Sequence, residues 1–147
     1  MSDHHLAQLN IAQMKFAIDD PGMADFVGLL DEINALADAA AGFVWRLQTE
    51  DGDATAIDFF GADMLVNMSV WTDIDSLHDY VYRSAHSRVM AQRREWFEHL
   101  REAYSVLWWI PVGHLPTLDE AKARLESLRE NGPGEQAFTF KQRYLPG

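Results

Sequence analysis

The sequence contains no cysteine, which excludes a disulfide framework, a thiol nucleophile and a zinc site built from thiolates. It also lacks any apolar run of the roughly 18–20 residues that a membrane-spanning helix needs. The N-terminus, Met1-Ser2-Asp3-His4-His5, carries neither the basic nor the apolar region of a signal peptide. We therefore expect no membrane partner and predict a cytoplasmic location.

Basic residues are scarce. The 12 Lys and Arg residues stand against 23 Asp and Glu, which gives a formal net charge of −11. Such a charge repels a phosphate backbone at long range, so nucleic acid is not an expected partner. The sequence also has no glycine-rich phosphate loop, no nucleophile elbow around a serine, and no His-x-x-x-His or His-Glu pair. Hydrolase chemistry and a metal site built from protein ligands are therefore not indicated.

Aromatic residues, by contrast, are plentiful: five Trp and eight Phe occur in 147 residues. This length is typical of a single domain with one core, so we predict one domain over residues 1–147. So many large rings indicate a wide apolar region that is either packed as core or lines a pocket.

Alternation and helical spacing predict strands at residues 6–14, 43–49, 64–71 and 104–112. In the first strand, Ala7, Leu9 and Ile11 face one side while Gln8, Asn10 and Ala12 face the other. In the second, Phe43, Trp45 and Leu47 are expected opposite Val44, Arg46 and Gln48. The fourth is almost wholly apolar and is expected to be the central strand.

Helices are predicted between these strands and after the last one. The first begins at an Asp20 N-cap followed by Pro21 and stops near Gly42. Capping boxes at Thr72 and Thr117 open two more helices, and residues 85–99 are predicted to be helical as well. The order β-α-β-β-α-β, with one helix appended, is the split βαβ arrangement of an α+β, ferredoxin-like fold with an antiparallel sheet and helices on one face.

The strands carry large apolar residues on both sides, whereas helices in such a fold cover one side. An uncovered second face would exceed the few hundred Å² of apolar patch that monomers tolerate. We therefore expect a homodimer in which two sheets face each other.

The whole chain resembles the domain-of-unknown-function family 3291. The segments that carry the resemblance are Gly42–Leu47, Asn67–Trp71, Tyr82–His86, Arg94–Phe97, and Leu107–Pro111 with Gly113-His114. The resemblance implies the dimeric α/β-barrel superfamily and assigns no chemistry. That superfamily includes cofactor-free and heme-degrading monooxygenases. In the heme-degrading members an Asn, a Trp and a His occupy elements where this sequence has Asn10, Trp71 and His86.

Two residues of the predicted 85–99 region could carry chemistry. His86 could act as a general base, an anion ligand or an iron ligand, or it could cap a helix end. Arg93 needs a carboxylate partner if it is buried, supplied either by the protein or by a substrate. The same two alternatives apply to Arg46.

Other polar and aromatic residues could line a ligand site. Asn10, Asn67 and Ser69 project from neighbouring strands, and their groups could bind a ligand or satisfy one another. Among the tryptophans, Trp71 and Trp96 are the expected pocket residues. We add Tyr82, which shares the predicted helical face with His86.

The sequence thus predicts a homodimer that binds a hydrophobic, partly anionic small molecule, with His86 and Arg93 as the catalytic residues if it is a monooxygenase-like enzyme. The cofactor is either none or heme. The alternatives are a heme-binding or heme-degrading protein and a non-catalytic dimeric scaffold whose aromatic region is fully packed.

Overall fold

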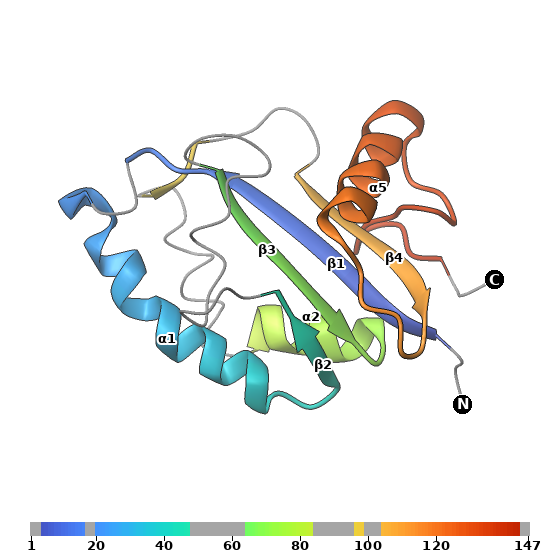
Figure 1. The fold of residues 1–147 in the computed structure, drawn as a ribbon, viewed down its shortest axis with the longest axis horizontal. Helices are drawn as coiled ribbons and strands as arrows, with labels where there is room; N and C mark the ends of the chain where they lie inside the picture. Colours follow the sequence, from blue (N-terminus) through green and yellow to red (C-terminus); the bar gives the residue numbers. More distant parts are fainter. Residues whose placement is uncertain (1–3, 17–19, 48–63, 84–95, 99–103, 145–147) are drawn as a thin grey trace.

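The fold is an antiparallel four-stranded sheet in the order β2-β3-β1-β4 (Figure 1). The computed structural model describes residues 4–16, 20–47, 64–83, 96–98 and 104–144. The strands are β1 (His4–Gln13), β2 (Phe43–Arg46), β3 (Met64–Trp71) and β4 (Ser105–Pro111). The helices are α1 (Ala24–Ala39), α2 (Ile74–Arg83) and α5 (Leu118–Asn131), and a short 3₁₀ turn, η1 (Pro21–Met23), precedes α1. The predicted α+β, ferredoxin-like fold is confirmed.

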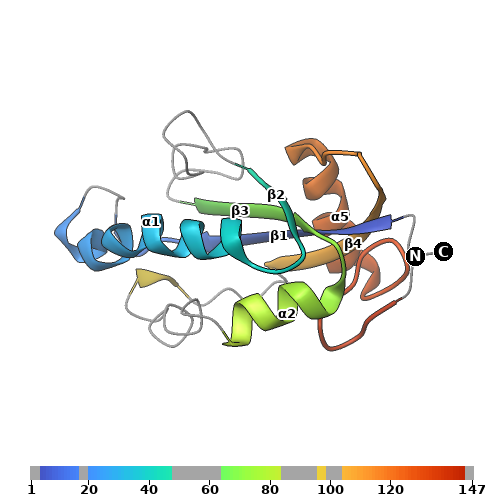
Figure 2. The same cartoon turned by 90° about the horizontal axis from the view of Figure 1, so that it is seen from below.

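The two faces of the sheet are covered by different helices (Figure 2). The side chains that form what we call the α5 face are Ala7, Leu9, Ile11, Val66, Met68, Val70, Val106, Trp108 and Ile110. They pack with Ala121, Leu125 and Leu128 of α5. The opposite side, which we call the cavity face, packs against α1 and α2. The two core helices lie on one face as predicted, and the appended helix occupies the other.

Every one of the nine α5-face side chains is at most 2% exposed in the single chain. The expected dimer rested on this face being left bare by the protein's own helices. Because one chain buries these residues, the face does not require a second copy, and the homodimer stays a prediction.

The helix starts follow the predicted capping chemistry with one correction. Asp20 Oδ1 accepts from Gly22 N at 2.8 Å, ahead of Pro21, as expected. At α2 the cap is Asp73, whose Oδ1 accepts from Ser76 N at 2.7 Å, so the prediction of Thr72 was wrong by one residue. At α5 Thr117 Oγ1 accepts from Glu120 N at 3.1 Å as predicted.

Gly42 ends the α1 region with φ +82°, a conformation that favours glycine. Its carbonyl accepts from Thr72 N at 2.8 Å, and a Cβ at this position would clash with Ser76 and Thr72. The predicted helix stop therefore also joins the start of β2 to the start of α2.

The side assignment of β2 differs from the prediction because of a β-bulge. Phe43 lies opposite Trp71 on the cavity face, whereas Trp45 lies opposite Val70 and packs on the α5 face. The register shifts between Phe43 and Trp45. A bulge adds a residue to one strand, which moves the following side chains to the other face.

β4 is an edge strand of the sheet, not the central strand that its apolar sequence predicted. Its two faces are covered by α5 and by the C-terminal segment, which explains the apolar composition. The segment also reaches its edge, since Leu107 N donates to Phe138 O at 2.8 Å and Phe138 N donates to Leu107 O at 2.9 Å.

The helix predicted over residues 85–99 does not include Phe97, which pairs with Met14 in an isolated β-bridge. Trp96, the residue before Phe97, is 2% exposed, and its ring packs against that of Phe26 with the centroids 5.4 Å apart. Most of this predicted helix lies outside the described residues.

Candidate functional site

A cavity of about 360 Å³ lies between the cavity face of the sheet and helices α1 and α2. Pockets for drug-sized molecules start near this size, at roughly 300 Å³. Its described lining residues are Gln8, Asn10, Asn34, Ala37, Arg46, Asn67, Ser69, Trp71, Leu77, Tyr80, Val81, Tyr104, Ser105, Leu107, Thr139, Phe140 and Lys141.

The floor of the cavity contains two rows of polar side chains that run across the sheet. Strand register aligns Arg46, Ser69 and Gln8 in one row, and Asn67, Asn10 and Ser105 in the next. We call these six residues the polar band. Residues two apart on a strand point to the same face, which places both rows on the cavity side.

Apolar clusters flank the polar band at both ends of the cavity face. Leu6, Trp71, Leu77, Leu107 and Phe138 belong to one cluster. The other contains Met14, Met23, Phe26, Trp96 and Phe97. A polar strip between two apolar clusters beneath helices is costly unless its groups find partners.

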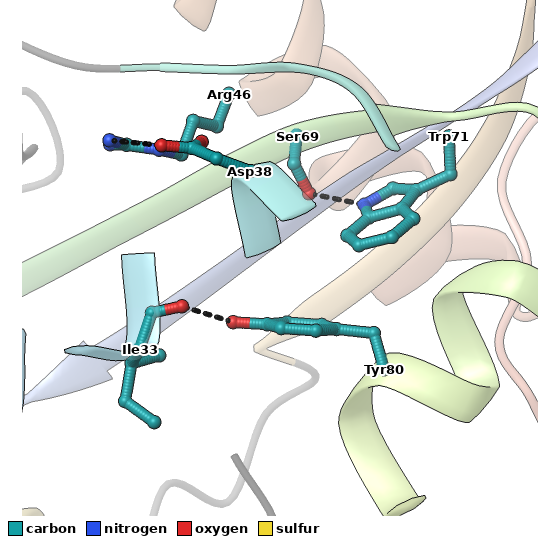
Figure 3. A network of polar contacts seen from close by, with 6 residues as sticks. All are labelled: Ile33, Asp38, Arg46, Ser69, Trp71 and Tyr80. Atoms are coloured by element: carbon teal, nitrogen blue, oxygen red, sulfur yellow. Dashed lines mark hydrogen bonds and ion pairs between the residues drawn. The ribbon is translucent and has the colours of Figure 1, made fainter. Parts of the chain in front are cut away.

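Part of the polar band satisfies itself. Gln8 Nε2 donates to Asn67 Oδ1 at 2.6 Å and to Ser69 Oγ at 2.8 Å. Ser69 Oγ also accepts from Trp71 Nε1 at 2.8 Å, as Figure 3 shows. These bonds fix the amide of Gln8 and orient the indole of Trp71.

Another part of the band, two amide oxygens, has no partner among the described residues. Asn10 Oδ1 is buried and accepts no hydrogen bond. In the part of the chain that the structure describes, Gln8 Oε1 likewise makes none, because the hydrogen bonds of Gln8 all come from its Nε2. An unsatisfied buried acceptor costs about 1–3 kcal/mol, so a ligand with a suitable donor would recover that free energy.

Arg46 is held by a carboxylate of the protein itself. Its Nε donates to Asp38 Oδ1 at 2.8 Å and its Nη2 to Asp38 Oδ2 at 3.4 Å (Figure 3). Of the two alternatives open from the sequence, the internal partner is the one observed. Arg46 still lines the cavity, but with a neutralising carboxylate beside it.

Tyr80 and Trp71 form the aromatic wall of the cavity, their rings stacked at 5.1 Å between centroids. The Tyr80 hydroxyl donates to Ile33 O of α1 at 3.1 Å, which joins the two helices (Figure 3). Burial raises the pKa of Tyr80 to about 12; Arg46 opposes this shift and Asp38 adds to it. The phenol therefore stays protonated at neutral pH and cannot serve as a general base there.

The C-terminal segment supplies the remaining wall through Thr139, Phe140 and Lys141. Phe140 packs edge-on to His78 of α2 with ring centroids 5.6 Å apart. Arg143 forms an ion pair with Asp75 of α2, with Nη1 3.5 Å from Oδ1. Its Nε also donates a hydrogen bond to Phe140 O at 3.2 Å. These contacts join the segment to α2 and position it beside the cavity.

Five of the predicted site residues line this one cavity: Asn10, Arg46, Asn67, Ser69 and Trp71. Trp96 does not, because it packs in the apolar cluster with Phe26 and Phe97 at the other end of the face. His86 and Arg93 lie outside the described residues. Tyr82 belongs to α2, but its side chain is not among those described.

Sequence reasoning missed several lining residues. Gln8 could have been found, because strand alternation places it on the same side as Asn10. Ser105 stood at the start of a segment dominated by its apolar character. Lys141 carried no signal, since nothing in its neighbours predicts that the C-terminal segment returns to the sheet.

Among the described residues, no group of three or more His, Asp or Glu side chains could hold a metal ion. The described helices also include none with the length and apolarity to cross a bilayer.

Comparison with solved structures gives remote similarities. A protein of unknown function from Nitrosomonas europaea is 13% identical with a TM-score of 0.48, over 78% of this chain and 95% of that chain. SnoaB, a cofactor-independent oxygenase from Streptomyces nogalater, is 18% identical with a TM-score of 0.45, over 80% of this chain and 98% of its own. A SnoaB variant gives 16% identity and a TM-score of 0.47, over 78% and 97% of the two chains. At these identities the similarity concerns the fold alone.

No curated protein matches the sequence. A family model does, over residues 5–147, which is nearly the whole chain. The chain therefore belongs to the family described as Domain of unknown function (DUF3291).

Proposed function

We propose that this protein binds a small, largely apolar and partly anionic molecule in the cavity between the sheet and helices α1 and α2. The observation that carries the proposal is Asn10 Oδ1, a buried acceptor without a partner in the cavity wall. Native proteins satisfy most buried polar atoms, so an orphan that faces a cavity supports a ligand as its partner.

The cavity also weighs against a packed scaffold. An aromatic core with no ligand role would close around Trp71 and Tyr80, whereas these two rings line about 360 Å³ of space. The polar band adds to this argument, because apolar residues in its place would stabilise the fold without needing partners.

The described lining supports binding more directly than catalysis. Among the described residues that line the cavity, none is a carboxylate or a histidine, and Tyr80 is protonated at neutral pH. A monooxygenase-like reaction would therefore need a base from the substrate or from elsewhere in the chain, and His86 and Arg93 stay predicted catalytic residues. Oxygen uptake in the presence of the bound compound measures this reaction.

Native mass spectrometry of the purified protein tests the proposal. We expect a small molecule that copurifies with the parent protein and is lost from Asn10→Leu while the melting temperature is kept. Leu125→Val, in helix α5 on the other side of the sheet, is a control that should retain the molecule. A thermal-shift screen with small aromatic and aliphatic acids covers the case of a ligand lost during purification. The proposal fails if no compound binds saturably with an affinity that the Asn10→Leu change lowers.

Heme is the second ligand class to test, because Asn10 and Trp71 line the same cavity. No described lining residue is a histidine, so His86 would have to supply the iron ligand. Titration with hemin should then give a Soret band that His86→Ala abolishes. An absence of saturable hemin binding removes this alternative.

We further propose a homodimer, as the superfamily resemblance implies. The described α5 face is buried within one chain, so the interface would involve other surfaces. Sedimentation at micromolar protein should give twice the mass of 16.7 kDa, and a stable monomer would contradict the dimer.

A further inference from the structure

We infer that the ligand of the proposed site is a hydroxylated organic acid: it presents a hydrogen-bond donor to Asn10 and Gln8 on β1, and a negative charge to Lys141 on the C-terminal segment. This inference rests on the proposed function and names the chemical class of the ligand. It depends on which polar atoms in the cavity already have partners.

Two of the unsatisfied atoms on the sheet side of the cavity are amide oxygens, which accept hydrogen bonds. Asn10 Oδ1 is buried without a donor, and Gln8 Oε1 makes no hydrogen bond within the described part of the chain. The Nε2 of Gln8 is fully committed to Asn67 and Ser69, which prevents the amide from turning to offer a donor. A ligand hydroxyl or N–H at this end would pair these two oxygens, whereas an ether or ketone oxygen would leave both acceptors unpaired.

The charge around the cavity is positive although the protein is acidic. Arg46 and Lys141 line the cavity, and no carboxylate does so among the described residues. Arg46 is paired with Asp38, whereas Lys141 has no ion-pair partner in the described part of the chain. Lys141 is thus the cation left to meet an anionic ligand group. A cationic ligand would find no counter-charge in this lining.

Strand register separates the two recognition points. Gln8 lies opposite Leu107, and Leu107 pairs in turn with Phe138, so the C-terminal segment passes about two strand spacings, roughly 10 Å, from Gln8. Lys141 follows Phe138 by three residues and lines the same cavity. The donor and the acid of the ligand should therefore sit at opposite ends of an apolar body, which contacts Leu107 and Phe140 between them.

Three naphthalene compounds separate these requirements by isothermal titration calorimetry. The compound 6-hydroxy-2-naphthoate has both the donor and the acid; 6-methoxy-2-naphthoate lacks the donor, and 2-naphthol lacks the acid. We expect the hydroxy acid to bind at least tenfold more tightly than either of the others. Equal affinities for all three would overturn the inference, together with the anionic part of the proposed function, but would leave a site in the cavity that binds an apolar molecule.

Two variants test which residue binds the donor end of the ligand and which binds its acid end. Asn10→Leu should remove the preference for hydroxy over methoxy acid, and Lys141→Gln should remove the preference for the acid over naphthol. Lys122→Gln, on α5, makes the same change in net charge on the other side of the sheet and should change neither preference. If Lys122→Gln and Lys141→Gln weaken acid binding equally, the effect is one of net charge and the role of Lys141 is refuted.

The outcome of this experiment is separable from that of the proposed function. If none of the three compounds binds, while another compound from the thermal-shift screen binds and loses affinity in Asn10→Leu, the hydroxy-acid class is wrong and the site stands. Asn10→Ala serves as a second variant, so that a folding defect in one replacement does not decide the result.

Discussion

The two faces of the sheet differ in what the same strands bury. On the α5 face, side chains from β1, β3 and β4 form an uninterrupted apolar layer under one helix. On the cavity face, the polar band interrupts the apolar surface and α1 and α2 leave a cavity above it. Alternating residues of one strand thus build an apolar core on one side and line a cavity on the other.

The largest expected effect comes from the α5 face. Leu9 is fully buried there, so Leu9→Ala should lower the free energy of unfolding by about 2–5 kcal/mol, through lost burial and the space left behind. Urea denaturation followed by circular dichroism measures it. Asn10→Ala, one residue further along the same strand, should cost far less. Equal losses at both positions would contradict the division between the faces.

On the cavity face, Asn10→Leu should lower ligand affinity without lowering stability. The replacement removes a buried acceptor without a partner and adds apolar area, so stability should stay the same or rise by about 1 kcal/mol. Ligand affinity should fall at the same time. Thermal melting with and without ligand measures both quantities, and a clear loss of stability would mean that Asn10 has a structural partner.

A third, smaller effect appears at alkaline pH. The pKa of Tyr80 is raised in the folded state from 10.0 to about 12. The stability that its protonated phenol contributes is therefore fully present below pH 10 and is lost as the pH rises from 10 to 12. Between pH 9 and 11 the free energy of unfolding of the parent protein should fall by about 1 kcal/mol more than that of the Tyr80→Phe variant. Parallel stability curves for the two proteins over this range would rule out a shifted Tyr80.

The smallest effect is expected at Asp38. Its carboxylate is half exposed, so Asp38→Ala should change stability by only about 0.2–1 kcal/mol. It should, however, strengthen the binding of an acid, because Arg46 loses its neutralising partner. Calorimetry with 6-hydroxy-2-naphthoate measures this gain, and unchanged affinity would show that Arg46 acts only in the α1–β2 contact.

The fold was predictable because its signals are local and repeated. Alternation in β3 placed Val66 and Met68 on one side and Asn67 and Ser69 on the other, as observed. The central position given to β4 was wrong, since an apolar run reports burial on both faces and says nothing about strand order. The prediction that Phe43 and Trp45 share one side was wrong, because a bulge leaves no clear mark in the sequence.

The site was only partly predictable, for reasons of distance along the chain. Asn10, Asn67 and Ser69 could be grouped because neighbouring strands share one face. Lys141 could not, because its place depends on a long-range pairing between Leu107 and Phe138. The sequence placed Tyr80 on the apolar face of its helix. Its hydrogen bond to the Ile33 carbonyl could not be predicted, because it depends on how α1 and α2 pack together.

The reciprocal pairing of Leu107 and Phe138 has a consequence for solubility. An unpaired strand edge is a template on which another chain can add a strand and begin to aggregate. Here the C-terminal segment occupies the middle of the β4 edge and also forms one wall of the cavity. Release of this segment would open the cavity and expose the unpaired β4 edge in the same step, so resistance to aggregation and retention of the proposed ligand should rise and fall together.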